Sequence, residues 1–224
     1  MRASNKSFLS QSRSVSQRPA SHRAAGSRQR HVSRDGRPVA AFRQRGTSAG
    51  AQVEDFNAPE TWHEPRENGK TRYIVAPAGT GFVHAVTVEE IRERLASLSA
   101  RFTRNLEVVQ LSAMTHKRRA FPCYGMQWGS AVYLYPIEVS LIESYYRPPK
   151  PQQEIEARMY GGKWSKNGKL WTLTWTAESI RDFYLNNVLI HEIGHLNDPR
   201  NTNSNDRERF ANWFAIEYGY RATR

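Results

Sequence analysis

The chain has 224 residues, a single cysteine and a formal net charge of +12 at neutral pH. One cysteine excludes a disulfide framework and a thiolate-rich structural zinc site. The sequence lacks both a run of about 18 apolar residues, which a membrane-spanning helix requires, and the apolar core of a secretory signal peptide. We therefore expect a soluble intracellular protein, cytoplasmic unless its N-terminus directs it to an organelle.

Residues 1–50 carry most of the positive charge. They contain 11 of the 33 Lys and Arg residues and one acid, Asp35, so their net charge is +10. Because they hold few large apolar side chains, they cannot bury enough surface to offset chain entropy, and we predict a disordered basic tail. Three roles fit such a tail: non-specific binding to nucleic acid through its phosphates, organelle targeting, or a solvated extension without a partner.

The remaining residues suffice for one domain with its own core. Pro and Gly punctuate residues 51–85, so we predict a loop-rich linker that leads into the domain and holds one strand at 72–76. The domain itself is predicted over residues 86–224.

Sequence periodicity then predicts one helix and three strands. The helix is predicted over 86–102, because Thr87 and Glu90 form a capping box ahead of an apolar stripe. The strands are segments rich in Val, Leu, Ile and Tyr. They are predicted at 107–112, 131–135 and 138–142.

The segment 162–175 has the pattern of a β-hairpin. Asn167 and Gly168 predict a type I′ turn between two arms that each contain tryptophan. On the second arm, Trp171 and Trp175 alternate with threonines, so one face is aromatic and the other polar. We predict that the aromatic face packs on the metal-binding helix described next. The alternative is a substrate platform, because an extended peptide can add to the edge of a sheet.

The most informative stretch of the chain is His191-Glu192-x-x-His195. It falls in a helix predicted over 178–197, which has Thr176 as its N-cap and an apolar stripe of leucine and isoleucine. Residues four apart lie on one helical face, so both imidazoles can bind one Zn²⁺ while Glu192 takes a proton from the attacking water. The alternative is that both histidines are ordinary polar positions of an amphipathic helix.

Catalytic zinc usually has three protein ligands, and Glu208 is the best candidate for the third. It lies in the first turn of a helix predicted over 206–215, where small residues such as Ala211 allow close approach to the first helix. Gly194, which is unfavourable inside a helix, also predicts a closely packed neighbour or a ligand near the backbone. The alternative for Glu208 is a capping box with Asn205. The reserve ligands are Asp198, Asp206 and Glu217.

Two short motifs thus stand close together in the sequence. They are His191-Glu192-x-x-His195 and Glu208-x-x-Ala211-Asn212-x-Phe214-Ala215. Together they resemble the gluzincin arrangement of zinc metallopeptidases, and they are most similar to the ImmA/IrrE type of bacterial and phage peptidase. The resemblance covers residues 188–217. It implies one zinc ion per chain bound by His191, His195 and Glu208, with Glu192 as the general base. The chain has Phe210 where family members usually have a second Glu.

Several other residues are candidates for supporting roles. Tyr184 and Tyr218 are candidates to donate a hydrogen bond to the oxyanion, and a packed core position is the alternative for each. Asn187 and Asn212 are candidates to orient the ligands as second-shell hydrogen-bond partners. Cys123 has no sequence signature of a nucleophile around it, and we predict a free, partly buried thiol.

The order of these elements predicts a small zincin-like α+β domain. In it, a mixed or antiparallel sheet packs on the active-site helix and on a second, C-terminal helix. We expect a zinc-dependent metallopeptidase with a protein or peptide substrate, in which Glu192 passes the proton of the water to the leaving amine. The alternative is a zinc-containing binding or regulatory protein that contacts nucleic acid non-specifically through residues 1–50. No expectation follows for the oligomeric state.

Overall fold

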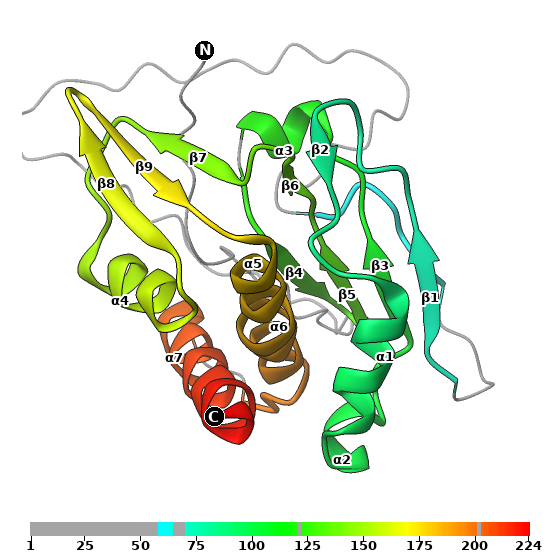
Figure 1. The fold of residues 1–224 in the computed structure, drawn as a ribbon. Coiled ribbons are helices and arrows are strands. Elements are labelled where there is room, and N and C mark those ends of the chain that lie inside the picture. Colours follow the sequence, from blue (N-terminus) through cyan, green and yellow to red (C-terminus); the bar gives the residue numbers. More distant parts are fainter. Residues whose placement is uncertain (1–57, 65–69, 121, 201–202) are drawn as a thin grey trace, which may run out of the picture. The chain divides into compact units, whose positions relative to one another are not determined.

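The computed structural model describes residues 58–64, 70–120, 122–200 and 203–224. The predicted disordered tail over residues 1–50 lies outside these described residues. In the described part, helices and strands form the predicted α+β arrangement (Figure 1). No helix in this part of the chain is both long and apolar enough to cross a membrane.

A four-stranded mixed sheet forms the centre of the domain. Its strands, in spatial order, are β1 (Arg72–Val75), β3 (Val108–Leu111), β5 (Ala131–Leu134) and β4 (Gly125–Trp128). β1, β3 and β5 are parallel, and β4 runs antiparallel to β5 at the edge. β3 and β5 are buried along their whole length, as in sheets that are covered on both faces. The strands predicted at 72–76, 107–112 and 131–135 are confirmed, whereas β4 was not predicted.

Different parts of the chain pack on the two faces of this sheet. One face packs on helices, which are described below. The other face packs on residues 58–64, where the Trp62 ring meets Trp128 of β4 edge-on, with 5.2 Å between ring centroids. Within the segment predicted as a loop-rich linker and start of the domain, 51–85, residues 58–64 contact the central sheet and residues 72–75 form its strand β1.

Two smaller sheets complete the strand structure. β2 (Phe82–Val83) pairs with β6 (Ile137–Glu138), and β7 (Ile142–Tyr145), β9 (Leu170–Thr174) and β8 (Lys163–Asn167) form an antiparallel sheet. The single strand predicted over 138–142 is wrong. Its two ends belong to different sheets, because the chain turns between them at Leu141, which has a φ of 54°.

β8 and β9 form the predicted hairpin, but the turn differs from the prediction. Asn167 pairs with Leu170, so the two loop residues are Gly168 and Lys169. Of these two, only Gly168 has a positive φ, at 59°. This pattern fits a type II′ turn, since a type I′ turn requires a positive φ at both loop residues.

Several helices accompany these sheets. α1 (Val88–Ala96) begins at the predicted capping box: Thr87 Oγ1 accepts from Glu90 N at 3.2 Å, and Glu90 Oε2 accepts from Thr87 N at 2.8 Å. The helix predicted over 86–102 is interrupted after α1, where the Ser97 hydroxyl donates to the Arg94 carbonyl at 2.7 Å. α2 (Ala100–Thr103) follows this break. α3 (His116–Ala120) and α4 (Pro151–Met159) were not predicted.

The helix predicted over 178–197 is present, with a π-helical turn in its middle. Thr176 is the N-cap, as predicted, and accepts from Ser179 N at 3.1 Å. The helix consists of α5 (Ala177–Phe183), the π turn η1 (Tyr184–Val188) and α6 (Leu189–Leu196). Asn186 in the π turn accepts hydrogen bonds from Arg94 Nε at 2.5 Å and from the Tyr160 hydroxyl at 2.9 Å. π turns occur frequently at functional sites, because the extra residue changes which face the following turns present.

α7 (Ser204–Ala215) packs against α6 and continues into η2 (Ile216–Tyr220) and η3 (Arg221–Thr223) (Figure 1). The approach of the two helices is close at one point. A Cβ built on Gly194 of α6 would lie 2.9 Å from Ala211 Cα and 3.0 Å from Phe214 Cβ of α7. The prediction that Gly194 has a closely packed neighbour is therefore confirmed.

We expect the substitution Gly194→Ala to destabilise the protein. Overpacking of about 1–3 kcal/mol outweighs the gain of up to about 1 kcal/mol that Ala has over Gly inside a helix. The backbone of Ala211 cannot move aside as a flexible side chain would. Urea unfolding measures the change, with Arg209→Ala on the exposed side of α7 as a control that should stay within about 0.5 kcal/mol. A Gly194→Ala variant as stable as the wild type would contradict this close approach.

Candidate metal centre

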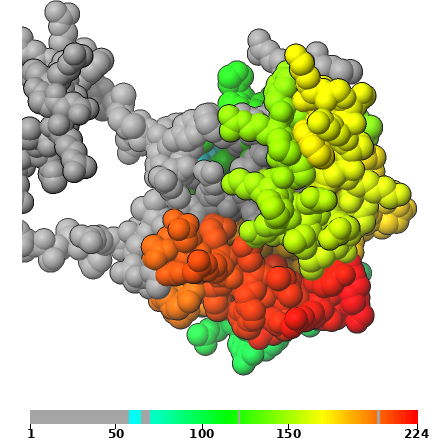
Figure 2. All heavy atoms as spheres, turned by 90° about the vertical axis from the view of Figure 1, so that its left-hand side faces the viewer, coloured from blue at the N-terminus to red at the C-terminus, as the bar shows by residue number. Residues whose placement is uncertain are grey.

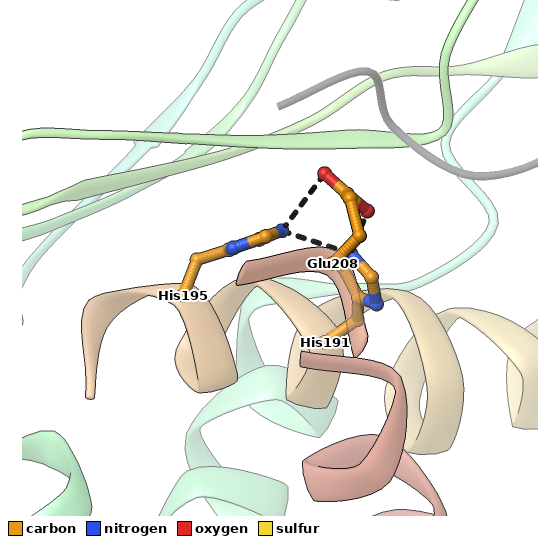
Figure 3. A group of neighbouring side chains, drawn as sticks. All are labelled: His191, His195 and Glu208. Atoms are coloured by element: carbon orange, nitrogen blue, oxygen red, sulfur yellow. Dashed lines mark hydrogen bonds and ion pairs between the residues drawn. The ribbon is translucent and has the colours of Figure 1, made fainter. Parts of the chain in front are cut away.

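Three side chains from two helices converge in one place. His191 and His195 come from α6, and Glu208 comes from α7 (Figure 3). The two histidine Nε2 atoms are 3.1 Å apart, and each lies 3.5 Å from one oxygen of Glu208. The potential ligand atoms of these three residues all lie within 4.8 Å of one another. The structure thus brings together the three residues that the sequence indicated as a ligand set.

The donor set fits a zinc ion. Zinc has bonds of about 2.0–2.1 Å to histidine nitrogen and carboxylate oxygen, so the ligand atoms of a tetrahedral site are roughly 3.3 Å apart. The observed separations of 3.1 and 3.5 Å bracket this value. The histidine side chains are buried, whereas the Glu208 side chain is 26% exposed. Glu208 is therefore the member of the cluster nearest to solvent, and catalytic zinc sites keep one coordination position open to water.

The structure does not match the capping role considered for Glu208. It also does not match a ligand role for the reserve candidates. α7 begins two residues earlier than a cap at Asn205 would allow, because Asn203 is the N-cap and accepts from Asp206 N at 3.0 Å. Glu208 is therefore not part of a capping box. Asp198 is held by the guanidinium of Arg200, at 2.7 Å from Nε. Glu217 pairs with Arg221. Asp198, Asp206 and Glu217 all lie outside the cluster.

The electrostatics of the two histidines differ. Burial, assisted by the charges of His191 and Arg207, lowers the pKa of His195 to about 2, so its imidazole is neutral, the form that binds metals. Burial also opposes protonation of His191, but hydrogen bonding to Glu208 and the charges of Glu192 and Glu208 outweigh it and raise the pKa of His191. A metal ion at His191 would therefore have to compete with a proton.

Glu192, the candidate base, is buried and lies against the edge strand β4. A Cβ on Gly125 of β4 would come within 2.7 Å of Val188 Cγ1 and 3.0 Å of Glu192 Oε1, so only glycine permits this approach. β4 is the last strand of its sheet, and in the described part of the chain its outer edge pairs with no other strand. The candidate base thus lies beside a sheet edge to which an extended peptide can add.

The hairpin packs on the first segment of the predicted metal-binding helix. Among the sheets, α6 packs chiefly on β4 and β5. The aromatic face of the hairpin packs one helix segment earlier, where Trp175 stacks on Phe183 of α5 with 4.9 Å between ring centroids. The aromatic face of the hairpin thus packs on the helix predicted over 178–197, as expected, but on its α5 segment rather than on α6, which carries the histidines. β4 is the sheet edge at the site.

The structure places Tyr184 in the core and Tyr218, which is partly buried, against it. Tyr184 is 1% exposed, and its hydroxyl donates to the carbonyl of Tyr135 at 2.7 Å. The ring of Tyr218 packs against Phe102 and Phe214, at 4.6 and 4.5 Å between centroids. The core alternative therefore describes Tyr184, whereas Tyr218 packs at the margin of the core. The hydroxyl of Tyr184 is already used in a buried hydrogen bond.

The two asparagines do not form the predicted hydrogen bonds to the ligands. Asn187 Nδ2 and Asn212 Oδ1 are buried without a hydrogen-bond partner among the described residues. The same is true of Nδ1 of His191 and Nδ1 of His195. The orienting role predicted for Asn187 and Asn212 is therefore not seen in the structure.

Sequence reasoning missed Glu156, which α4 brings close enough for its charge to act on His191 and Glu208. Burial is the main cause that raises the pKa of Glu156 to about 7. α4 buries only Ala157 completely, so it lacks the broad apolar stripe by which a helix is recognised in a sequence. No sequence signal pointed to Glu156.

Cys123 is the free, partly buried thiol that the sequence predicted. Burial raises the pKa of Cys123 to about 12, although Arg118, with Nη1 at 3.5 Å from Sγ, favours the thiolate. Only the thiolate is a good nucleophile. A raised pKa means less thiolate at any given pH, so this thiol is poorly suited to nucleophilic catalysis.

We therefore expect slow alkylation of native Cys123 by iodoacetamide at pH 8. The thiolate fraction there is on the order of one in ten thousand, against roughly a quarter for an unperturbed cysteine. Mass spectrometry of the native protein, with the urea-unfolded protein as the control, measures the rate. Equal rates in the native and unfolded protein would contradict the burial of Cys123.

Comparison with known proteins identified no relative of this chain. No protein-family model, no curated protein and no solved structure matches the chain. The similarity to gluzincins therefore rests on the two motifs and remains a hypothesis.

Proposed function

We propose that this chain is a zinc-dependent metallopeptidase. His191, His195 and Glu208 would hold one zinc ion, and Glu192 would be the general base. The observation that carries the proposal is the convergence of two histidine Nε2 atoms and a carboxylate at separations that suit tetrahedral zinc. A purely structural zinc site needs no buried base beside it, so the position of Glu192 favours catalysis.

The proposed reaction is the hydrolysis of a peptide bond. When bound, the zinc ion would polarise the scissile carbonyl and make the attacking water more acidic. Glu192 accepts a proton from this water as its oxygen attacks the carbonyl carbon, and then donates the proton to the nitrogen that leaves. Because Glu192 is buried, bulk water does not compete for this proton.

The proposed substrate is an extended stretch of protein or peptide. It would pair with the outer edge of β4, as peptides do when they add a strand to a sheet. Gly125 supports this arrangement, because the missing side chain brings the β4 backbone next to Glu192. Backbone pairing would hold the scissile bond beside the base whatever the neighbouring side chains are.

A peptide-library digestion tests this function. Zinc-loaded protein is incubated with a proteome-derived peptide library, and new termini are identified by mass spectrometry, with Glu192→Gln as the inactive control. We expect new termini with the wild type only. Stoichiometric zinc without any cleavage would favour the alternative, a zinc-containing binding or regulatory protein whose residues 1–50 contact nucleic acid.

A further inference from the structure

α4 brings a third carboxylate, that of Glu156, to the candidate metal centre. α4 lies next to the end of α7 that is farther from the C-terminus (Figures 1 and 2). Two neighbours of Glu156 fix α4 in place: Ala157 is fully buried, and the Tyr160 hydroxyl donates to the Asn186 carbonyl at 2.9 Å. Asn186 lies in the π turn that leads into the helix of His191. α4 is therefore tied to the helix that carries the site.

Glu156 is near the candidate ligands without belonging to them. Its charge acts on both His191 and Glu208. Its oxygens, however, are not among the ligand atoms that lie within 4.8 Å of one another. Oε1 accepts a hydrogen bond from Gln152 Nε2 at 2.8 Å, whereas Oε2 is buried and has no hydrogen-bond partner in the described part of the chain.

Two charged groups act most strongly on Glu156: His191 favours its ionised form, and Glu208 disfavours it. A bound zinc ion would carry two positive charges, which the carboxylates of Glu192 and Glu208 would neutralise. The negative charge of an ionised Glu156 would then remain unbalanced. Within the described part of the chain, no Lys or Arg is among the groups that act most strongly on Glu156. A buried carboxylate oxygen without a donor is unfavourable, and a cationic donor would offset this cost most effectively.

We propose that Glu156 determines specificity by binding a cationic group of the substrate close to the scissile bond. The group is an ammonium or guanidinium, which donates hydrogen bonds to Oε2 and supplies the missing positive charge. It can come from a Lys or Arg side chain or from a free α-amine at the substrate N-terminus. This assignment rests on the proposed peptidase function, since it places the substrate at the same site.

Peptide binding tests this role independently of turnover. The protein is the full-length chain carrying Glu192→Gln, studied with and without zinc, so that binding is measured without cleavage. The probes are N-acetylated alanine pentapeptide amides with Arg at each position in turn, the same set with citrulline, and alanine pentapeptide amide with a free α-amine. Calorimetry or fluorescence competition gives each dissociation constant.

We expect Arg at one position, or the free α-amine, to bind at least tenfold more tightly than its neutral counterpart. Adding Glu156→Gln should remove this preference, because the amide keeps the shape and the Gln152 contact but not the charge. Glu154→Gln, an exposed acid on the same helix, should change nothing. Because citrulline has nearly the shape of Arg but no charge, it shows whether binding depends on charge. Because acetylation removes the charge of the α-amine, it shows whether the cation that binds is a side chain or the N-terminus.

The outcomes distinguish this inference from the proposed function. Equal affinity for Arg and citrulline peptides together with no effect of the free amine would overturn the role of Glu156, as would a cation preference that survives Glu156→Gln. Zinc content, measured in the same samples, should be unchanged by Glu156→Gln. One outcome would separate the two proposals: no sample binds zinc, but cationic peptides bind more tightly and Glu156→Gln removes this preference. The peptidase proposal would then fail while the cation site stands.

Discussion

Replacement of His191 by Ala is expected to abolish stoichiometric zinc binding. Wild-type protein purified without chelators should contain about one zinc ion per chain. Loss of even a residue that only orients a zinc ligand typically costs about 10–100-fold in affinity, so loss of a ligand should cost at least about 100-fold. Glu208→Ala should weaken binding, since it leaves the two histidines 3.1 Å apart without their carboxylate partner. Elemental analysis and competition with a chromogenic chelator measure both effects.

The matched control for this experiment is His116→Ala. His116 is an exposed histidine at the start of α3 and lies outside the cluster. It should leave the zinc content unchanged. Circular dichroism of each variant separates loss of a ligand from loss of the fold. A His191→Ala variant that is folded and still holds one zinc ion would show that the metal binds elsewhere.

Zinc affinity should also fall as the pH is lowered. Hydrogen bonding to Glu208 raises the pKa of His191 against the opposing effect of burial, so a proton occupies the ligand nitrogen more readily as the medium becomes more acidic. His195, whose pKa burial lowers to about 2, should contribute nothing to this trend. Chelator competition at several pH values measures it. Affinity that rises toward acidic pH would contradict the assignment of His191 as a ligand.

Replacement of Glu192 by Gln is expected to keep the zinc and remove the activity. General acid–base groups contribute about 100- to 10,000-fold to rate, so hydrolysis of a peptide identified from the library should fall by at least about 100-fold. Zinc content should not change, because Glu192 is not among the clustered ligand atoms. Gln has nearly the same shape as Glu, so it should also preserve the packing against Gly125.

The control for this variant is Glu154→Gln, which removes an exposed carboxylate from α4. It should retain wild-type activity. Initial rates at several substrate concentrations separate loss of turnover from loss of binding. A Glu192→Gln enzyme with full zinc content and wild-type turnover would remove Glu192 from the mechanism.

Local sequence patterns predicted much of the site, because its ligands lie on two helices that follow each other in the chain. The spacing of His191 and His195 places them on one helical face, and Thr176 marks where the helix starts. Ala211 and Gly194 also indicated close helix packing, which the structure confirms. Each of these signals depends on residues near one another in the sequence.

Other parts of the site depend on tertiary contacts, which no local pattern encodes. β4 is short and contains Gly125, and its importance lies in its approach to Glu192, far along the chain. The π turn at Asn186 is bound from outside the helix, by Arg94 and Tyr160. Sequence periodicity assumes a regular helix, so it could not predict this turn.

Errors among the strands have a similar cause. The apolar run at 138–142 has strand propensity, but the positive φ of Leu141 divides it between two sheets. In the hairpin, the pairing of Asn167 with Leu170 moves the turn one residue along from the predicted position. Register of this kind is set by packing of the whole sheet rather than by the turn residues alone.

The most direct test of the central claim is zinc-edge anomalous diffraction from crystals of the zinc-loaded protein. The account predicts one strong peak per chain, within bonding distance of Nε2 of His191, Nε2 of His195 and a carboxylate oxygen of Glu208. A peak that contacts other residues, or no peak in protein equilibrated with zinc, would contradict it.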